Sequence, residues 1–116
     1  MKYRPGGAFD PHHDFYEDEQ KDDGYDFGNR VAQAMVFLSD VELGGGFAMP
    51  ELDIYINPRP GRMVVWHNMD QNGENDLRTL HGGCPVFSGN KLAAITSYHH
   101  LNQKKWNCKN KLNILN

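Results

Sequence analysis

The sequence of 116 residues predicts one all-β domain, arranged as a sandwich or a barrel. Two observations lead to this prediction. Short apolar runs, several of them β-branched, alternate with turns and show no regular alternation with helical segments. The turns are clusters of Gly, Pro, Asn and Ser that recur at short intervals, at 44–46, 58–61, 71–75 and 88–90.

The expected strands can be justified in chain order. The turn at 3–7 leads into a first strand that reaches the paired histidines His12 and His13. The longest apolar run, 31–38, contains alanines that would permit a helix, but the Gly-Asn start and the flanking turns favour a strand. Three further strands follow, one half-buried, one strongly β-branched and one closing the series, at 54–56, 62–66 and 92–98.

The chain divides into a domain and a tail. Residues 1–101 carry the strand pattern, whereas 102–116 are rich in Lys and Asn and are expected to be a poorly ordered C-terminal tail. Acidic residues crowd 17–26, which we expect to be a solvated loop; steering of a basic substrate is the alternative.

Composition excludes some classes of function. The net charge of −3 argues against a nucleic-acid partner, which would require a concentrated basic surface. Neither an apolar run long enough to span a membrane nor a signal peptide occurs in the chain. The sequence is therefore expected to be a soluble domain or a fragment of one.

His12 and Asp14 are the first candidate metal ligands. Successive side chains alternate across a strand, so His12 and Asp14 should point the same way and His13 the other way. A His-x-Asp triplet alone is more often a surface or structural pair. Two histidines and one carboxylate, with open positions opposite, form the ligand set of non-haem Fe(II) oxygenases, so a third ligand is expected from a distant strand.

His81 is the preferred third ligand among the six histidines. Gly82 and Gly83 follow it and would allow a close approach of the backbone. His67 follows an apolar strand and reads as a satisfied core or surface histidine. His99 and His100 lie next to the polar tail without an obvious strand around them.

Lys91 is a candidate anchor for a dicarboxylate co-substrate. Such a molecule chelates the metal at one end and needs a cation for the other, which a lysine on the strand after His81 could supply. Without the other candidate residues, Lys91 would be interpreted as an ordinary exposed lysine after a turn. The triplet, the distant histidine and the lysine are more specific together than any of them alone.

These residues resemble the catalytic domain of animal prolyl 4-hydroxylases. The similarity covers about residues 3–91 and weakens towards Cys108. Beyond the candidate ligands it rests on six short runs in the same order: YRPGG at 3–7, GNRVA at 28–32, LSDVE at 38–42, VWHN at 65–68, GCPV at 83–86 and GNK at 89–91.

The resemblance implies a fold and a set of roles. The fold is a double-stranded β-helix, or jelly roll, here in an N-terminally truncated or minimal version. By the resemblance His12, Asp14 and His81 bind Fe(II), while Lys91 and Tyr3 hold 2-oxoglutarate.

The resemblance also implies an activity. It is that of an oxidoreductase, a procollagen-proline 4-dioxygenase that hydroxylates proline in proline-rich or collagen-like peptides at C4 and releases succinate and CO₂. L-Ascorbate would keep the iron reduced, a protein disulfide isomerase subunit would be a partner, and the location would be the endoplasmic reticulum lumen.

The two cysteines are open to several readings. Cys84 and Cys108 could form a disulfide, bind a metal with other ligands or stay reduced. The resemblance implies the disulfide and an oxidising compartment.

Three positions depart from the family pattern. Phe47 stands where the family has threonine, which removes a hydroxyl and would narrow the co-substrate pocket. Leu92 and Ser97 replace tryptophans, which would leave a gap if those sites are buried. Three alternatives therefore stay open: a catalytically impaired relative that binds a peptide or partner, a hydroxylase for another peptidyl residue, and a structural jelly roll with an incidental His-x-Asp.

Overall fold

The computed structural model describes residues 1–17 and 27–101. In these ranges the chain forms β-strands and the short 3₁₀ helices η2 (Pro50–Leu52) and η3 (Leu77–Thr79), with no α-helix. The predicted tail at 102–116 and all but the first residue of the acidic segment lie outside the described residues. No helix within the described residues is long and apolar enough to cross a bilayer.

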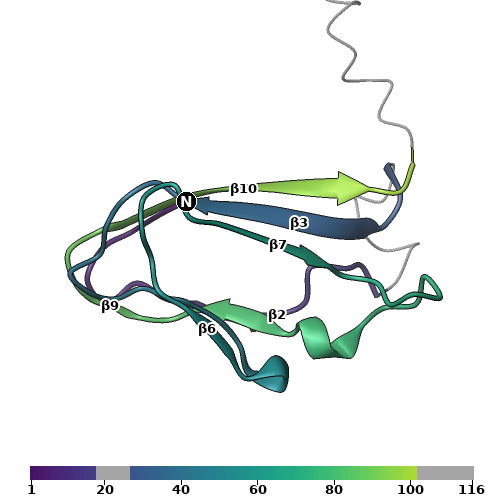
Figure 1. Ribbon diagram of the computed structural model, residues 1–116, viewed down its shortest axis with the longest axis horizontal. Helices are drawn as coiled ribbons and strands as arrows, with labels where there is room; N and C mark the ends of the chain where they lie inside the picture. The colour runs from purple at the N-terminus through teal and green to yellow at the C-terminus, as the bar shows by residue number, and fades with distance from the viewer. Residues whose placement is uncertain (18–26, 102–116) are drawn as a thin grey trace, which may run out of the picture.

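Four antiparallel strands form the first sheet, the upper layer of Figure 1. Their order is β1 (Lys2–Tyr3), β10 (Lys91–His99), β3 (Arg30–Phe37) and β7 (Met63–His67). The pairing of β10 with β3 runs from Ala93 opposite Phe37 to His99 opposite Arg30. A strand rather than a helix at 31–38 is therefore confirmed. The expectation for His99 is wrong, because it is the last residue of β10.

Four strands of three or four residues form the second sheet, the lower layer of Figure 1. Their order is β2 (Phe9–His12), β8 (His81–Gly83), β5 (Phe47–Met49) and β6 (Ile54–Ile56). A separate two-stranded pair joins β4 (Leu43–Gly44) to β9 (Val86–Ser88). The sequence suggested that Lys91 lies on the strand directly after His81. This is wrong, because β9 lies between β8 and β10 in the chain.

The core lies between the two sheets and confirms the prediction of a β-sandwich. Alternate residues of β3 point inwards and are buried, while their neighbours are only partly covered. The buried cluster draws on both sheets and consists of Met35, Phe37, Phe47, Met49, Trp66 and Ala93. A single apolar layer of this kind is what a two-sheet domain of this size can bury.

The outer face of the first sheet is apolar and exposed. Its exposed large side chains are Met63, Val65, Leu92 and Tyr98. Leu92 is 41% exposed, so this departure from the family leaves no buried gap at its position, contrary to the sequence-based expectation. Ser97 lies on the opposite face of β10 and is half-buried.

Candidate metal centre

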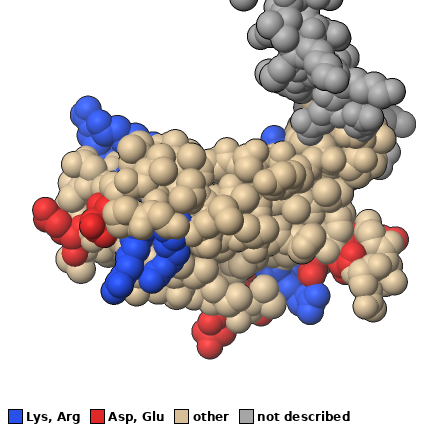
Figure 2. Space-filling model, turned by 45° about the horizontal axis from the view of Figure 1, so that its top comes forward, with Lys and Arg blue, Asp and Glu red and all other residues tan. Residues whose placement is uncertain are grey.

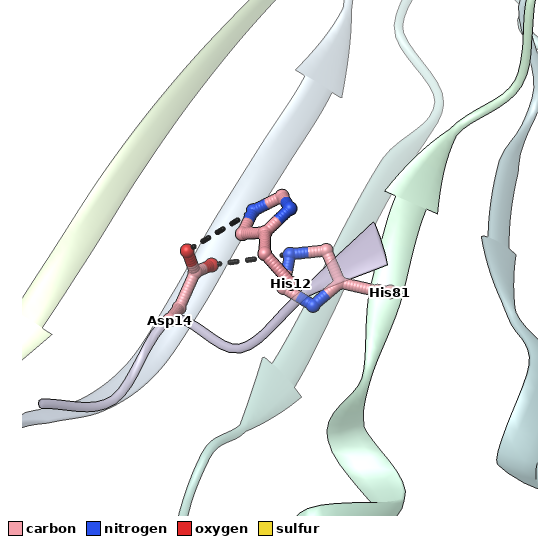
Figure 3. Close-up of side chains that lie close together, drawn as sticks. All are labelled: His12, Asp14 and His81. Carbon is pink, nitrogen blue, oxygen red and sulfur yellow. Dashed lines mark ion pairs between the residues drawn. The ribbon is translucent and has the colours of Figure 1, made fainter. Parts of the chain in front are cut away.

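Three side chains converge at the edge between β2 and β8 (Figure 3). His12, the last residue of β2, lies opposite His81, the first residue of β8, and their ring centroids are 4.5 Å apart. Asp14 follows two residues after β2 has ended, so a bend rather than strand alternation brings it to the same side. The potential ligand atoms of the three residues all lie within 4.8 Å of one another.

The carboxylate of Asp14 faces both imidazoles. Its Oδ1 lies 3.5 Å from Nε2 of His12, and its Oδ2 lies 3.3 Å from Nε2 of His81. Oδ2 is buried and accepts no hydrogen bond of good geometry. A buried anionic oxygen that accepts no hydrogen bond is costly, and a cation placed between these three groups would offset that cost.

The backbone fixes which nitrogen of each histidine faces the carboxylate. Nδ1 of His12 lies 2.7 Å from the carbonyl oxygen of Asp10, and Nδ1 of His81 lies 2.8 Å from that of Thr79. A carbonyl oxygen only accepts, so each Nδ1 carries a proton and donates it. In the neutral imidazole Nε2 then has a free lone pair directed towards Asp14, the arrangement of a metal-binding histidine with its supporting contact.

The protonation state of Asp14 also suits a metal ligand. Burial raises the pKa of its carboxyl, but the close approach of His81 and the charges of His12 and Arg30 outweigh burial and hold the pKa below its usual value. The group is therefore ionised at neutral pH, as metal binding requires. Two imidazoles and one carboxylate form a donor set that fits Fe(II).

Aromatic rings enclose His81 on the core side. The ring of Trp66 lies 4.8 Å and that of Phe47 5.4 Å from the His81 ring, centroid to centroid. A Cβ on Gly82 would lie 2.9 Å from the carbonyl oxygen of Phe9, so the glycine does allow the close approach expected of it. The role of Trp66 was missed in the sequence analysis, where this residue appears only as the end of a β-branched strand and in the VWHN run.

Lys91 is buried beside the metal centre and has no anionic partner among the described residues. It is 3% exposed, and its Nζ lies 5.3 Å from the ring centroid of Tyr3 and 5.4 Å from that of Phe37. Tyr3 is its partner in the register of β1 and β10. Burial lowers the pKa of the ammonium group, so an anion that entered here would relieve an unfavourable charge.

One small cavity is lined both by candidate metal ligands and by the lysine. Its volume is about 40 Å³, and its lining includes His12, His81, Lys91, Tyr3 and Phe47. A larger hollow of about 740 Å³ contains none of these residues and is lined by Tyr16, Asn29, His67, Asp70, Glu74 and others. The candidate metal ligands and Lys91 therefore line the smaller of the two cavities.

The other candidate residues lie elsewhere. Nε2 of His13 is 2.9 Å from the carbonyl oxygen of Leu77, so this ring turns away from Asp14 as predicted. His67 is exposed at the end of β7, and Nδ1 of His99 lies 2.8 Å from the carbonyl oxygen of Gly28. Cys84 is half-buried, whereas Cys108 lies outside the described residues.

Charge is distributed without a dominant sign on the face shown in Figure 2. Lys and Arg side chains alternate with Asp and Glu side chains along its margin, and a broad uncharged area separates them. This face offers no concentrated basic patch to a polyanion.

The sequence is similar to those of prolyl 4-hydroxylase alpha subunits. The human prolyl 4-hydroxylase subunit alpha-1 is 36% identical over 104 residues, which are 88% of this chain and 20% of that protein. The chicken subunit alpha-2 is 37% identical over 97 residues, which are 84% of this chain and 18% of that protein. The chain thus spans about a fifth of the length of these curated relatives.

A solved structure shares the fold. The viral collagen prolyl hydroxylase from Paramecium bursaria Chlorella virus-1, in its 2-oxoglutarate complex, superposes with a TM-score of 0.72 at 31% identity over 83% of this chain and 54% of that chain. The expected jelly roll is thereby confirmed. The family model of the 2OG-Fe(II) oxygenase superfamily matches residues 1–100. The chain therefore belongs to the 2OG-Fe(II) oxygenase superfamily.

Proposed function

We propose that this chain is the catalytic core of a prolyl 4-hydroxylase, an Fe(II)- and 2-oxoglutarate-dependent dioxygenase that hydroxylates peptidyl proline at C4. The observation that carries the proposal is the meeting of two imidazole Nε2 atoms with the carboxylate of Asp14, whose buried Oδ2 accepts no hydrogen bond of good geometry. The names of the similar proteins, prolyl 4-hydroxylase subunits and a collagen prolyl hydroxylase, support this choice within the superfamily.

Each residue of the site has a role in this proposal. His12, Asp14 and His81 would hold Fe(II) through two imidazole nitrogens and one carboxylate oxygen. Lys91 binds the distal carboxylate of 2-oxoglutarate, and Tyr3 beside it offers a hydroxyl to the same group. The iron, when bound with 2-oxoglutarate and O₂, supplies the oxidation that yields succinate, CO₂ and hydroxyproline.

The two aromatic rings beside His81, those of Trp66 and Phe47, contribute by excluding water. Trp66 and Phe47 cover the core side of His81, and His81 and Lys91 are both buried, so these two side chains lie in a poorly hydrated environment. In such an environment the attraction between Lys91 and a carboxylate is stronger than in water. In this proposal the residues of the chain position the metal and the co-substrate, supply the charge of Lys91 and keep water away. None of them acts as a general acid or base.

The substrate, partners and location belong to the same proposal. We propose a proline-rich or collagen-like peptide as substrate, L-ascorbate as reductant of the iron, and a protein disulfide isomerase subunit as a partner in the endoplasmic reticulum lumen. A disulfide between Cys84 and Cys108 would fit that compartment. We further propose that residues 1–101 form the domain and 102–116 its tail.

One observation favours a second candidate function. Phe47 lines the small cavity together with His81 and Lys91, and its ring stacks on that of His81, which would suit a catalytically impaired relative that binds peptide or a partner. A hydroxylase for another peptidyl residue would share the same metal centre. Only substrate turnover distinguishes these candidates from the main proposal.

The test is release of succinate from 2-oxoglutarate with purified protein, with and without Fe(II). A proline-rich peptide is compared with the same peptide carrying alanine or lysine in place of proline. We expect iron-dependent formation of succinate and hydroxyproline with the proline peptide and not with the alanine or lysine peptide. Turnover on the lysine peptide would indicate the related hydroxylase, and no turnover by folded, iron-loaded protein would indicate the impaired relative.

A further inference from the structure

Phe47 is held firmly in the wall of the small cavity. Its strand β5 is paired on both sides, with Phe47 opposite Ile56 of β6 and opposite Gly83 of β8. The side chain is 3% exposed, and its ring meets that of Trp66 at 5.1 Å between centroids. Since the backbone is fixed by two neighbours, only rotation of the side chain can move this ring.

The position of Phe47 lies between the metal centre and the buried cation. The ring stacks on that of His81 with an interplanar angle of 30°. Gly83, its neighbour across the sheet, is next to Lys91, because a Cβ on this glycine would lie 3.5 Å from the lysine Nζ. A molecule that reaches from the metal ligands to Lys91 therefore has to pass this ring.

The space beside this ring is small. The cavity has a volume of about 40 Å³ and is partly open to solvent. The Phe47 ring takes up part of the path that a five-carbon dicarboxylate would follow from the metal ligands to Lys91. The charge of the site thus suits 2-oxoglutarate, since Lys91 is buried without an anion among the described residues, but Phe47 narrows the space for it.

We propose that Phe47 determines which 2-oxo acid this site accepts. 2-Oxoglutarate binds only after the Phe47 ring has turned away from His81, and a shorter 2-oxo acid that stays at the metal end binds without this movement. The proposal rests on the proposed function, because it assumes a metal at His12, Asp14 and His81. It adds a residue that controls the size of the co-substrate.

The experiment measures binding rather than turnover. The protein is loaded with Mn(II) without oxygen and titrated with 2-oxoglutarate or with pyruvate, and the fluorescence of Trp66 reports binding because its ring lies 4.8 Å from that of His81. A Trp106→Phe background removes the other tryptophan. Each variant is compared with its own signal before titration.

Phe47→Thr should lower the Kd for 2-oxoglutarate about tenfold or more, which corresponds to about 1.4 kcal/mol. The Kd for pyruvate should change much less, since pyruvate does not extend to Lys91. Phe47→Val is measured alongside, because it keeps an apolar β-branched residue in β5 if threonine prevents folding. Met49→Thr is the matched control: this residue is buried on the same strand but is not in the cavity lining.

The outcomes separate this inference from the proposed function. Equal Kd values for 2-oxoglutarate in the unchanged protein and both Phe47 variants would overturn the inference and leave the proposed function intact. An equal gain in Met49→Thr would also overturn it, because loosening of β5 would then be the cause. Metal binding without 2-oxoglutarate binding in any variant would overturn the proposed co-substrate, and the inference with it.

Discussion

At the scale of single residues, the candidate centre depends on the direction of a few atoms. Nε2 of His12 and of His81 both face Asp14 because each Nδ1 is engaged by a backbone carbonyl. Lys91 adds a buried charge that no described carboxylate neutralises. Ligand binding should therefore be sensitive to these four side chains and insensitive to nearby histidines that face elsewhere.

Replacement of His81 by alanine should lower metal affinity by at least about 100-fold. Loss of a supporting contact around a metal ligand typically costs 10–100-fold, and loss of the ligand itself should cost no less. Calorimetric titration with Mn(II) or with Fe(II) without oxygen measures the change. His67→Ala is the control, since that ring is exposed at the end of β7. Equal affinity of His81→Ala and the unchanged protein would rule out this ligand.

Replacement of Lys91 by methionine should stabilise the protein in the absence of ligand. Burial holds the pKa of Lys91 below its ordinary value of 10.5. Between the two values the unfolded chain binds more protons than the folded one, so the free energy of unfolding of the unchanged protein rises with pH across that window.

The advantage of Lys91→Met should therefore be largest at neutral pH and shrink as the pH approaches 10.5. Urea unfolding of both proteins at pH 7 and pH 10 measures it. With Mn(II) present throughout, added 2-oxoglutarate should stabilise the unchanged protein more than it stabilises Lys91→Met. A variant that is less stable at both pH values would show that the ammonium group has a favourable partner.

The sequence and its resemblance to the family predicted the charged residues of the site and a place for Phe47 in the pocket, but not the contacts that enclose His81. His12, Asp14, His81 and Lys91 follow from residue type and order, because metal and carboxylate chemistry restricts which side chains can serve. The contacts of Phe47 and Trp66 with His81 depend on how three strands pack, and no local pattern encodes that arrangement. The groups that accept hydrogen bonds from the two histidine Nδ1 atoms are backbone carbonyls. Every residue has such a carbonyl, so the sequence cannot reveal these contacts.

At the scale of elements, the centre is built on the pairing of β2 with β8. Gly82 in β8 allows this pairing to be close, and its neighbour His81 depends on it. Longer strands such as β3 and β10 were predictable from their apolar runs. The two- and three-residue strands β4, β5 and β9 were not, because such strands are defined by their partners rather than by their own pattern.

Gly82→Ala should lower metal affinity about tenfold as well as stability. The added Cβ would lie 2.9 Å from the Phe9 carbonyl oxygen, so β2 and β8 must separate and carry His12 away from His81. Gly73→Ala is the control: it has open space but a φ of +81°, so it should cost about 1 kcal/mol of stability with metal affinity unchanged. Thermal melts and metal titrations distinguish the effects, and unchanged affinity in Gly82→Ala would contradict the expected separation.

At the scale of the whole molecule, one thin core joins both sheets. The class of fold was predictable because turn spacing and strand length suffice for it. The order of strands in each sheet was not, because it depends on pairings between residues far apart in the chain, such as His12 with His81. A domain of this kind should unfold as a unit.

Phe37→Ala should destabilise the whole domain by about 3–5 kcal/mol, a large part of the roughly 5–15 kcal/mol of a typical domain. Phe37 is completely buried in the core shared by the two sheets. Met63→Ala, at an exposed position of the outer face, should change stability by about 0.5 kcal/mol or less. Urea unfolding followed by circular dichroism measures both. Equal effects at the two positions would show that this core is not what holds the sheets together.

The carbonyl groups behind the two histidines have a consequence for how such a site can change through evolution. The acceptors belong to the main chain of Asp10 and Thr79, and every amino acid that could replace these residues brings the same carbonyl. Mutations at both positions can therefore accumulate without altering the tautomer of either ligand. Only a change in the path of the backbone can remove this support, so selection at the centre should act on the three ligands and on the strand pairing rather than on the residues that orient the rings.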